Sequence, residues 1–400
     1  MDKDSKTLKF NRTIQAPVDY LYYAFTKKTG WNDWFSEGAE GDALKHKQIF
    51  LMWKSGYSAG LQFTHLKENE QLTFTWHGSE DTHPTEVNVY FQEQGEETEV
   101  VVDHRRVSAD RVEYITKLWE EGLRNWQSVF EEGRDRRIYD RPMFGVMIKD
   151  MVTPEMAKEK NLPADHGMLL GETLKGMGAY ASGLTGGDLI VEVSGVKIEN
   201  YASIEKVIGP AKPGDIVEML YYRGDEKRVA QVELTLRSLP EIPPTAQGFS
   251  EKLSEIYQSA NAKIDEVTEG ITETQAEYRR KPGEWNSKEV FAHLIANERD
   301  MYSWAGTLVQ GNESYGWLDH LPARLKSIQL VFPQIPDLRH ELQSVQREGV
   351  GFIAELPGEF VSRKSSYVRL ANSFFFAIPM HYKDHIGQIQ DNLAAFQGVS

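Results

Sequence analysis

The chain has no cysteine among its 400 residues. Disulfide bonds, thiolate zinc sites and cysteine nucleophiles are therefore excluded, and any bound metal must be held by His, Asp or Glu. The sequence also lacks the run of about 18 apolar residues that a transmembrane helix needs. Its charged start, MDKDSKTLKF, lacks the apolar stretch of a signal peptide. These absences predict a cytoplasmic protein that does not span a membrane.

A net positive charge is also absent, because 60 Asp and Glu outnumber 45 Lys and Arg and give a formal net charge of −15 at pH 7. Nucleic acid and anionic membranes are bound by basic surfaces that displace counterions, so neither is expected as the main partner. Hydrophobic residues make up 40% of the chain and charged residues 26%, which is typical of folded globular proteins. A chain of this length is too long for one ordinary hydrophobic core, and it predicts a multidomain protein.

The first segment has the pattern of a sheet closed by a long helix. Residues 7–15 alternate as a strand does, and Ala16-Pro17-Val18 starts a short helix. Five further strands are predicted, over Gln48–Lys54, Gly60–Leu66, Gln71–His77, Glu86–Gln92 and Glu97–His104. From Asp110 to Glu132, apolar residues recur at helical spacing, at Val112, Ile115, Trp119, Leu123, Trp126 and Phe130.

This β-α-β(n)-α order, with the aromatic segment Gly30-Trp31-Asn32-Asp33-Trp34-Phe35, resembles the START-like SRPBCC superfamily, in particular its Hsp90-ATPase-activator-like branch. The resemblance covers residues 1–138. It implies an α+β helix-grip fold whose sheet surrounds the long helix and encloses a cavity for an apolar small molecule. Six of the nine tryptophans lie in this region. They either line such a cavity or simply fill the core.

Residues 139–238 have a different pattern, in which short apolar strands alternate with glycine turns. Successive segments read Arg141-Pro-Met-Phe144-Gly145-Val146, Gly187-Asp188-Leu-Ile-Val and Pro213-Gly214-Asp215. They resemble a mainly-β PDZ domain of the bacterial HtrA-associated kind. The resemblance implies that the C-terminal peptide of another protein is the partner, and that the loop of Phe144, Gly145 and Val146 holds its carboxylate. The alternative is a PDZ domain that has lost its ligand and only packs against its neighbours.

Residues 239–247 form a linker, because three prolines in a short stretch prevent a helix or a central strand. Residues 248–400 then show helical patterns from about Phe249 to Ile271, Asn286 to Gln310, Ala323 to Glu355 with a break at its prolines, and Leu370 to Phe396. This predicts an all-α four-helix bundle.

Three histidines of this bundle are expected to share one site. His381 and His385 lie four residues apart, so they fall on the same helix face, and apolar residues before and after them place that face inward. His293 lies on the inner face of another predicted helix. An imidazole in an apolar interior must form hydrogen bonds or coordinate an ion. Three neutral imidazoles make a metal site with an open position.

The motifs Gly283-Glu-Trp-Asn-Ser-Lys-Glu-Val-Phe-Ala-His293-Leu and His381-x3-His385-x-Gly-Gln resemble those of the DinB/YfiT-like bundle family. The resemblance implies that His293, His381 and His385 hold a divalent metal ion such as zinc, nickel or iron. It also implies a metal-dependent transferase or isomerase that acts with a low-molecular-weight thiol. As an enzyme, the protein is expected to be a metal-dependent thiol transferase or a hydrolase. The alternative is three core histidines satisfied by hydrogen bonds.

Other polar residues of the bundle are assigned lesser roles. Asn297, one turn after His293, is expected to face the site, whereas Asp384 is expected to be solvated. His320 and His340 are interpreted as surface or helix-end residues. Whether the protein is an enzyme stays open at this point, and the alternative function is a non-enzymatic adaptor or a carrier of an apolar ligand.

Overall fold

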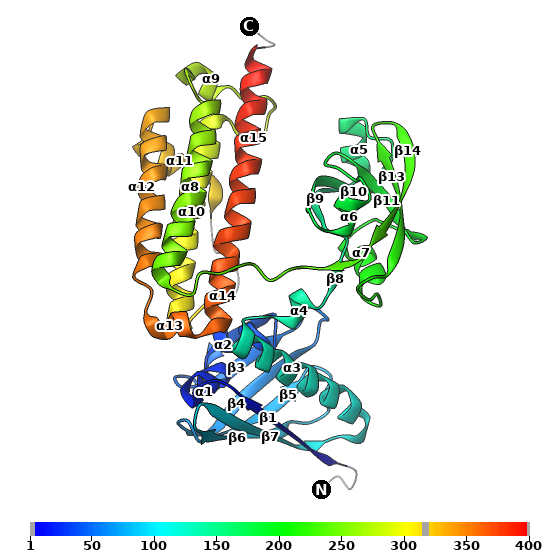
Figure 1. The fold of residues 1–400 in the computed structure, drawn as a ribbon, viewed down its shortest axis with the longest axis vertical. Helices are drawn as coiled ribbons and strands as arrows, with labels where there is room; N and C mark the ends of the chain where they lie inside the picture. Colours follow the sequence, from blue (N-terminus) through cyan, green and yellow to red (C-terminus); the bar gives the residue numbers. More distant parts are fainter. Residues whose placement is uncertain (1–4, 314–319, 398–400) are drawn as a thin grey trace. The chain divides into compact units, whose positions relative to one another are not determined.

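The computed structural model of the protein describes residues 5–313 and 320–397 (Figure 1). The chain divides into two compact units. Unit 1 comprises Met1–Gly133 and Glu241–Ser400, and unit 2 comprises Arg134–Pro240. The START-like and bundle segments predicted from the sequence therefore share one unit, while the three-domain boundaries at 138, 238 and 247 stay predictions.

The first part of unit 1 is a seven-stranded antiparallel sheet with the strand order β1-β7-β6-β5-β4-β3-β2. Its strands are β1 (Lys6–Ile14), β2 (Gly38–Asp42), β3 (Gln48–Met52), β4 (Ser58–Lys67), β5 (Gln71–Gly78), β6 (Thr85–Gln94) and β7 (Glu97–Val107). Alternation buries one face, as Leu72, Phe74 and Trp76 of β5 show. The strands predicted from residues 7–15 and 48–104 are confirmed.

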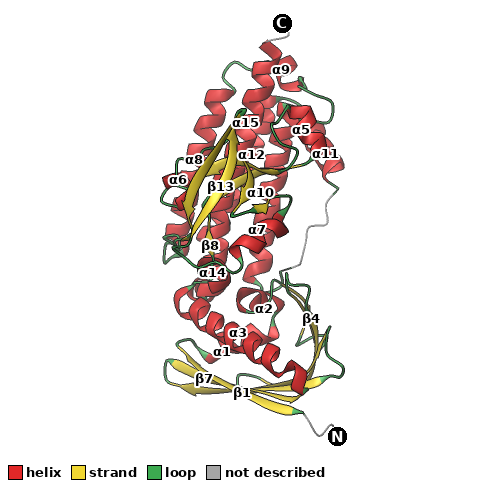
Figure 2. Cartoon of the chain, turned by 90° about the vertical axis from the view of Figure 1, so that its right-hand side faces the viewer, coloured by secondary structure: helices red, strands yellow, loops and turns green. Residues whose placement is uncertain are grey.

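The predicted long helix is α3 (Val112–Glu132), which lies across the sheet (Figure 2). Its apolar stripe packs into the sheet core, because Ile115, Trp119, Leu123, Trp126 and Phe130 are buried. Two short helices, α1 (Val18–Thr26) and α2 (Lys28–Trp34), precede β2. No helix was predicted at α2, whose Gly30 is a poor helix former. A Cβ at Gly30 would lie 2.7 Å from the Ala24 Cα, so glycine is what lets α2 pack closely on α1.

Unit 2 is built around a six-stranded sheet with the main order β14-β13-β11-β10-β9, in which β12 pairs with β11. The strands are β8 (Pro142–Met143), β9 (Val146–Val152), β10 (Gly167–Thr173), β11 (Leu189–Val193), β12 (Val196–Lys197), β13 (Ile216–Arg223), β14 (Glu226–Glu233) and β15 (Thr235–Leu236), with β8 paired separately to β15. Four short helices accompany them: α4 (Arg136–Tyr139), α5 (Pro154–Lys160), α6 (Gly178–Ala181) and α7 (Tyr201–Ile208). The strand β9 forms one edge of this sheet.

The second part of unit 1 is helical. Its long helices are α8 (Ala246–Val267), α10 (Ser287–Val309), α12 (Ile335–Ala354) and α15 (Ile378–Gln397). Contacts join α8 to α12, α12 to α10, α10 to α15 and α15 to α8, so these four helices close a ring around a common core. The segment predicted from Ala323 to Glu355 is split at its prolines into α11 (Leu321–Val331) and α12.

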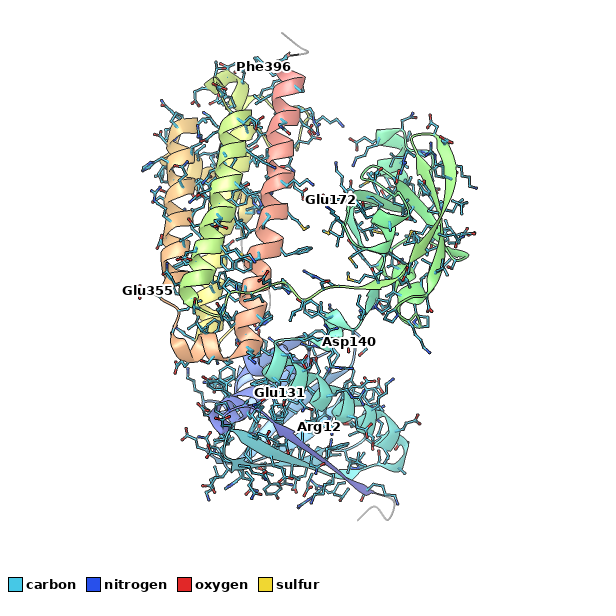
Figure 3. The ribbon with its side chains drawn as sticks, in the orientation of Figure 1. Arg12, Glu131, Asp140, Glu172, Glu355 and Phe396 are labelled. Atoms are coloured by element: carbon cyan, nitrogen blue, oxygen red, sulfur yellow. The ribbon has the colours of Figure 1, made fainter. Side chains whose placement is uncertain are left out.

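Shorter helices complete this bundle: α9 (Glu273–Glu277), α13 (Gly358–Ser362) and α14 (Lys364–Asn372). Phe396 lies near the end of α15 (Figure 3). Its ring contacts that of Tyr278, which follows α9. A π-helical turn, Ser373–Ala377, joins α14 to α15 without a loop, so the last helix is longer than predicted. Among the described residues, no helix combines the length and the apolarity that crossing a membrane requires.

Candidate metal centre

Helices α10 and α15 carry the three candidate ligands. The helix α10 begins at a capping box in which Asn286 and Glu289 bond each other's backbone amides, as their spacing predicts. This start places His293 in the second turn. On α15, Ile378 and Ile389 are buried in the bundle core, so the helix face that carries His381 and His385 turns inward. His385 is buried, and the other two histidines are half-buried.

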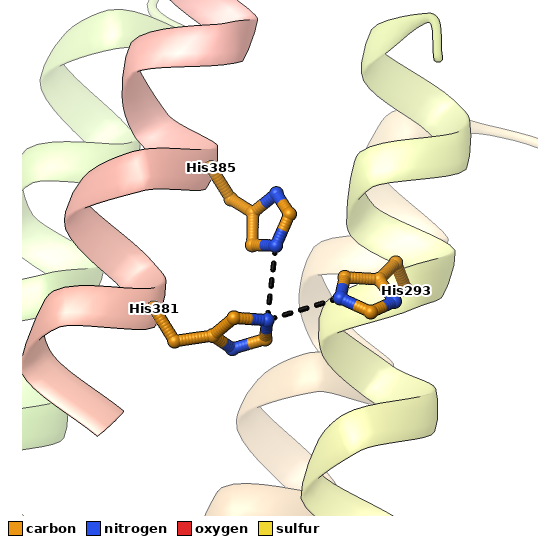
Figure 4. Close-up of side chains that lie close together, drawn as sticks. All are labelled: His293, His381 and His385. Carbon is orange, nitrogen blue, oxygen red and sulfur yellow. Dashed lines mark hydrogen bonds between the residues drawn. The ribbon is translucent and has the colours of Figure 1, made fainter. Parts of the chain in front are cut away.

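The three imidazoles converge in the structure (Figure 4). The Nε2 atom of His381 lies 3.0 Å from Nε2 of His293 and 2.9 Å from Nε2 of His385. Each ring offers one nitrogen atom as a ligand, and these three atoms all lie within 4.8 Å of one another. Residues 88 positions apart in the sequence therefore form one cluster of nitrogen donors.

Hydrogen bonding alone satisfies this cluster poorly. Nδ1 of His385 lies 2.9 Å from the acceptor Oε1 of Gln388, so Nδ1 carries the proton and Nε2 presents its lone pair to the cluster. A single proton on Nε2 of His381 can serve only one of that atom's two histidine contacts. Nδ1 of His381 is buried and makes no hydrogen bond within the described part of the chain. A cation among the rings would instead use a lone pair from each.

The core histidine of the N-terminal sheet provides a contrast. The indole Nε1 of Trp119 donates to Nδ1 of His104 at 3.0 Å, and Nε2 of His104 lies 2.7 Å from the hydroxyl of Thr85. Each ring nitrogen of His104 thus has its own partner, as expected for a histidine that serves only the core. His381 lacks that arrangement.

The environment favours the neutral form of His381 and His385. Burial, with the neighbouring His385 and His293, lowers the pKa of His381 to about 3. Burial also lowers the pKa of His385, although the hydrogen bond with Gln388 opposes this effect. Because metal ions bind neutral imidazole, both rings are ready for coordination at neutral pH without losing a proton first.

Two neighbours of the cluster were not assigned roles from the sequence. The ring of Trp285 lies 4.7 Å from that of His293 and 6.0 Å from that of His385, between centroids. Gln388 holds the ring of His385 in place by a hydrogen bond. Its position three residues after His385 on the same helix is the feature of the sequence that indicates this contact. Trp285 and Gln388 both line an open groove with Arg280, Gly283, Glu284 and Asn392.

The structure also shows where the other polar residues singled out from the bundle sequence lie. Asn297 is half-buried, and within the described part of the chain it forms no hydrogen bond with the three histidines. That Asn297 faces the site stays a prediction, whereas Gln388 makes the hydrogen bond with His385. Asp384 is exposed as predicted. His320 caps the start of α11 and His340 is exposed, which agrees with their interpretation as helix-end and surface residues.

A second polar network crosses the bundle core. The carboxylate of Glu298 on α10 accepts hydrogen bonds from the hydroxyls of Tyr257 on α8, at 2.5 Å, and Tyr382 on α15, at 2.7 Å. Gln346 on α12 donates to the Tyr382 hydroxyl, and Asn261 donates to Gln346. All four long helices are thereby joined. Periodicity could not reveal this network, because its members come from distant segments.

The ionisation of Glu298 should make the free energy of unfolding depend on pH. Burial raises the pKa of its carboxyl from 4.5 to about 7, although both tyrosines donate to it. Between these values the folded state binds more protons than the unfolded state, so the free energy of unfolding falls as pH rises through this window. We expect Glu298→Gln to remove about 3 kcal/mol of that fall, measured by urea unfolding at pH 4.5 and 8 in EDTA. Equal pH profiles for the variant and wild type would contradict this prediction.

In unit 2, the predicted peptide loop joins β8 to β9. Phe144 is buried in the core of this unit, and its carbonyl accepts from the amide of Ala179. Gly145 has φ of +79°, and its carbonyl accepts from the amide of Leu174. A Cβ at Gly145 would lie 2.3 Å from the Met177 Cβ, so packing as well as conformation requires glycine here. Val146 is half-buried at the start of the edge strand β9.

The tryptophans of the N-terminal sheet pack against one another. The rings of Trp31 and Trp34 stack at 5.5 Å, those of Trp34 and Trp126 stack at 5.0 Å, and Phe25 meets Trp126 edge-on at 5.2 Å. All four side chains are fully buried. This packing favours the core-filling interpretation over a cavity lined by tryptophan.

A comparison with protein families identifies the first of these folds. A family model described as "Activator of Hsp90 ATPase homolog 1-like protein" matches residues 15–131. Residues 15–131 form an AHSA1-type, START-like domain. The predicted fold of the first segment is thereby confirmed. The matched region contains β2 to β7 and nearly all of α3, begins just after β1, and ends before unit 2 begins.

Solved structures with a similar region include the Aha1 dimer from Colwellia psychrerythraea, at 17% identity and a TM-score of 0.29. That match covers 32% of this chain and 98% of the other. An HSP90 activator from Plasmodium falciparum matches at 20% identity and a TM-score of 0.27, over 31% of this chain and 94% of the other.

Curated relatives include the periplasmic pH-dependent serine endoprotease DegQ of Escherichia coli (strain K12), at 27% identity over 144 residues, which are 34% of this chain and 31% of DegQ. A probable periplasmic serine endoprotease DegP-like of Hahella chejuensis is 32% identical over 103 residues, or 26% of this chain and 22% of the relative. The chain thus spans less than a third of these proteins. The PDZ domain and the cytoplasmic location therefore stay predictions.

Proposed function

We propose that the helical bundle is a divalent-metal site of the DinB/YfiT-like kind, with His293, His381 and His385 as ligands and zinc, nickel or iron as the ion. The observation that carries this proposal is the convergence of three nitrogen donors within 4.8 Å. The lone pair of His385 Nε2, oriented by Gln388, supports it further. A hydrogen-bonded core would give each nitrogen its own partner, as at His104.

A metal held by three imidazoles lowers the pKa of a bound water or thiol and so supplies a nucleophile at neutral pH. That chemistry fits a metal-dependent thiol transferase or a hydrolase. In either reaction, Gln388 keeps the proton of His385 on Nδ1, and Trp285 shields the cluster from water on one side.

Metal analysis of the purified protein tests the proposal. Wild-type protein dialysed against zinc or nickel should retain about one ion per chain by inductively coupled plasma mass spectrometry, since the cluster offers one centre. His293→Ala and His385→Ala should each lose it. Retention of the ion by both variants, or a metal-free wild type, would rule out this site.

The second candidate function is that of a non-enzymatic adaptor. It is favoured by the AHSA1-type domain and by the edge strand β9, which pairs with β10 on one side and follows the Phe144–Gly145–Val146 loop. An exposed sheet edge can add a peptide strand, and loop amides can hold the terminal carboxylate. The partner would be the C-terminal peptide of another protein. An apolar-ligand carrier has less support, because aromatic rings fill the sheet core.

A free C-terminal carboxylate should decide peptide binding. We expect an apolar-ended peptide to bind unit 2 of the full chain at least tenfold more tightly as the acid than as the amide, measured by fluorescence anisotropy. Gly145→Ala should weaken binding, because its Cβ would collide with Met177. The matched control is Gly183→Ala, which has the same φ of +79° but nothing within 4 Å of the added Cβ. Equal binding of acid and amide would refute this recognition mode.

A further inference from the structure

A buried ionic cluster joins the AHSA1-type domain to the bundle within unit 1. Asp33 on α2 has a fully buried side chain, and it accepts hydrogen bonds from Arg369 Nε at 3.0 Å and from Ser366 Oγ at 2.6 Å. The remaining guanidinium nitrogens of Arg369 donate to both carboxylate oxygens of Glu313, at 2.8 and 2.7 Å. Burial raises the pKa of Asp33, and Arg369 opposes that effect. The cation on α14 therefore holds a buried anion of the neighbouring domain.

The same cluster reaches α10. The indole Nε1 of Trp304 donates to Glu313 Oε1 at 2.8 Å, and the Glu313 amide donates to the hydroxyl of Thr29 at 3.1 Å. Nearby, a Cβ at Gly311 would lie 2.6 Å from the hydroxyl of Tyr23, which indicates close packing between α1 and the segment after α10. Glu313 thus contacts residues of α2, α10 and α14.

The ionic cluster and the histidine cluster bridge the same two helical segments. Along the uninterrupted helix α14–π–α15, Arg369 precedes His381 by about 18 Å at 1.5 Å per residue. Along α10, His293 precedes Trp304 by about 16 Å on the same basis. Contacts join α10 both to α15 and to α14. Two sets of contacts, the histidine cluster and the ionic cluster, therefore join α10 to the α14–α15 segment at two separate levels.

We propose that metal binding at the histidine cluster and the stability of the AHSA1-type domain are thermodynamically linked through these two sets of contacts. An ion bound by the histidine cluster holds α10 against α15. Separation of α10 from α14 is the motion that would release Glu313 and then Asp33. The ion therefore lowers the population of states in which α2 is detached from the bundle. Linkage is reciprocal, so anything that clamps the AHSA1-type domain also tightens metal binding. This inference rests on the proposed metal function.

Hydrogen exchange of the full chain, followed by mass spectrometry, tests the linkage. Saturating zinc should slow amide exchange in peptides covering α2 (Lys28–Trp34) at least fivefold in the wild type. Asp33→Asn should reduce this slowing to less than twofold, while the zinc affinity from calorimetry stays within threefold of wild type. Glu313→Gln provides a second variant if Asp33→Asn does not fold, and the same result is expected.

Two controls separate the possible outcomes. Asp300→Asn removes the ion pair with Arg324 between α10 and α11, outside the interface, and should keep the slowing. His385→Ala should lose it together with zinc binding. If zinc binds the wild type but leaves α2 exchange unchanged, the linkage is overturned and the metal site stands. If zinc does not bind at all, the proposed function fails and the linkage fails with it.

Discussion

Zinc or nickel should raise the unfolding temperature of the wild-type protein by roughly 8 °C or more at a concentration 1,000-fold above the dissociation constant. At that ratio a ligand that binds only the folded state adds about 4 kcal/mol to the free energy of unfolding. For a domain of 150–250 residues, each kcal/mol corresponds to about 2–4 °C. The effect arises because the ion cross-links α10 to α15, which unfolding must separate. Differential scanning calorimetry with added metal and with EDTA measures it.

Replacing one ligand should abolish this shift and leave the chelated protein almost unchanged. His385→Ala and His293→Ala are the test variants, and His340→Ala, an exposed histidine on α12, is the matched control. A histidine held only by hydrogen bonds would behave differently, because its loss would lower stability equally with metal and with EDTA. A metal-induced shift that persists in both test variants would show that the ion binds elsewhere.

Arg369→Met should destabilise unit 1 by about 3–5 kcal/mol, because it leaves Asp33 as a buried carboxylate without its cation. Methionine keeps most of the volume of the aliphatic stem, so the loss reports charge pairing rather than a cavity. Urea unfolding at pH 7 in EDTA, followed by tryptophan fluorescence, measures the change. Six of the nine tryptophans lie in the AHSA1-type segment, so the signal reports mainly that domain.

The matched control for this variant is Arg324→Met. Arg324 pairs with both carboxylate oxygens of Asp300, as Arg369 does with those of Glu313. Asp300 keeps 29% of its side chain exposed, whereas Asp33, which Arg369 contacts through one oxygen, keeps none. Water can solvate Asp300 once the Arg324 guanidinium is removed, so the free energy of unfolding should fall by only about 1 kcal/mol. Similar costs for the two variants would mean that Asp33 is not held by Arg369 in the folded protein.

Much of the fold could be predicted because it depends on local pattern. The alternation in β5 and the stripe from Ile115 to Phe130 each fix which face of one element is buried. The helix α2 was missed, because its stability comes from packing on α1 through Gly30 rather than from helix propensity. Pro333 and Pro336 marked a break, and the structure has two separate helices there, with Pro333 between α11 and α12 and Pro336 in the first turn of α12.

The sequence by itself determined which three histidines could meet, because four-residue spacing fixes His381 and His385 on one face and helix periodicity turns both inward. Only the tertiary structure decided their neighbours. Asn297 has suitable spacing yet does not bond the cluster, whereas Gln388 does. Asp33 and Arg369 are 336 residues apart, so no periodic pattern could pair them. Hydrophobic periodicity is a property of a single element, but the burial of a charge depends on which surfaces of distant elements meet, and that is settled only when the chain has folded.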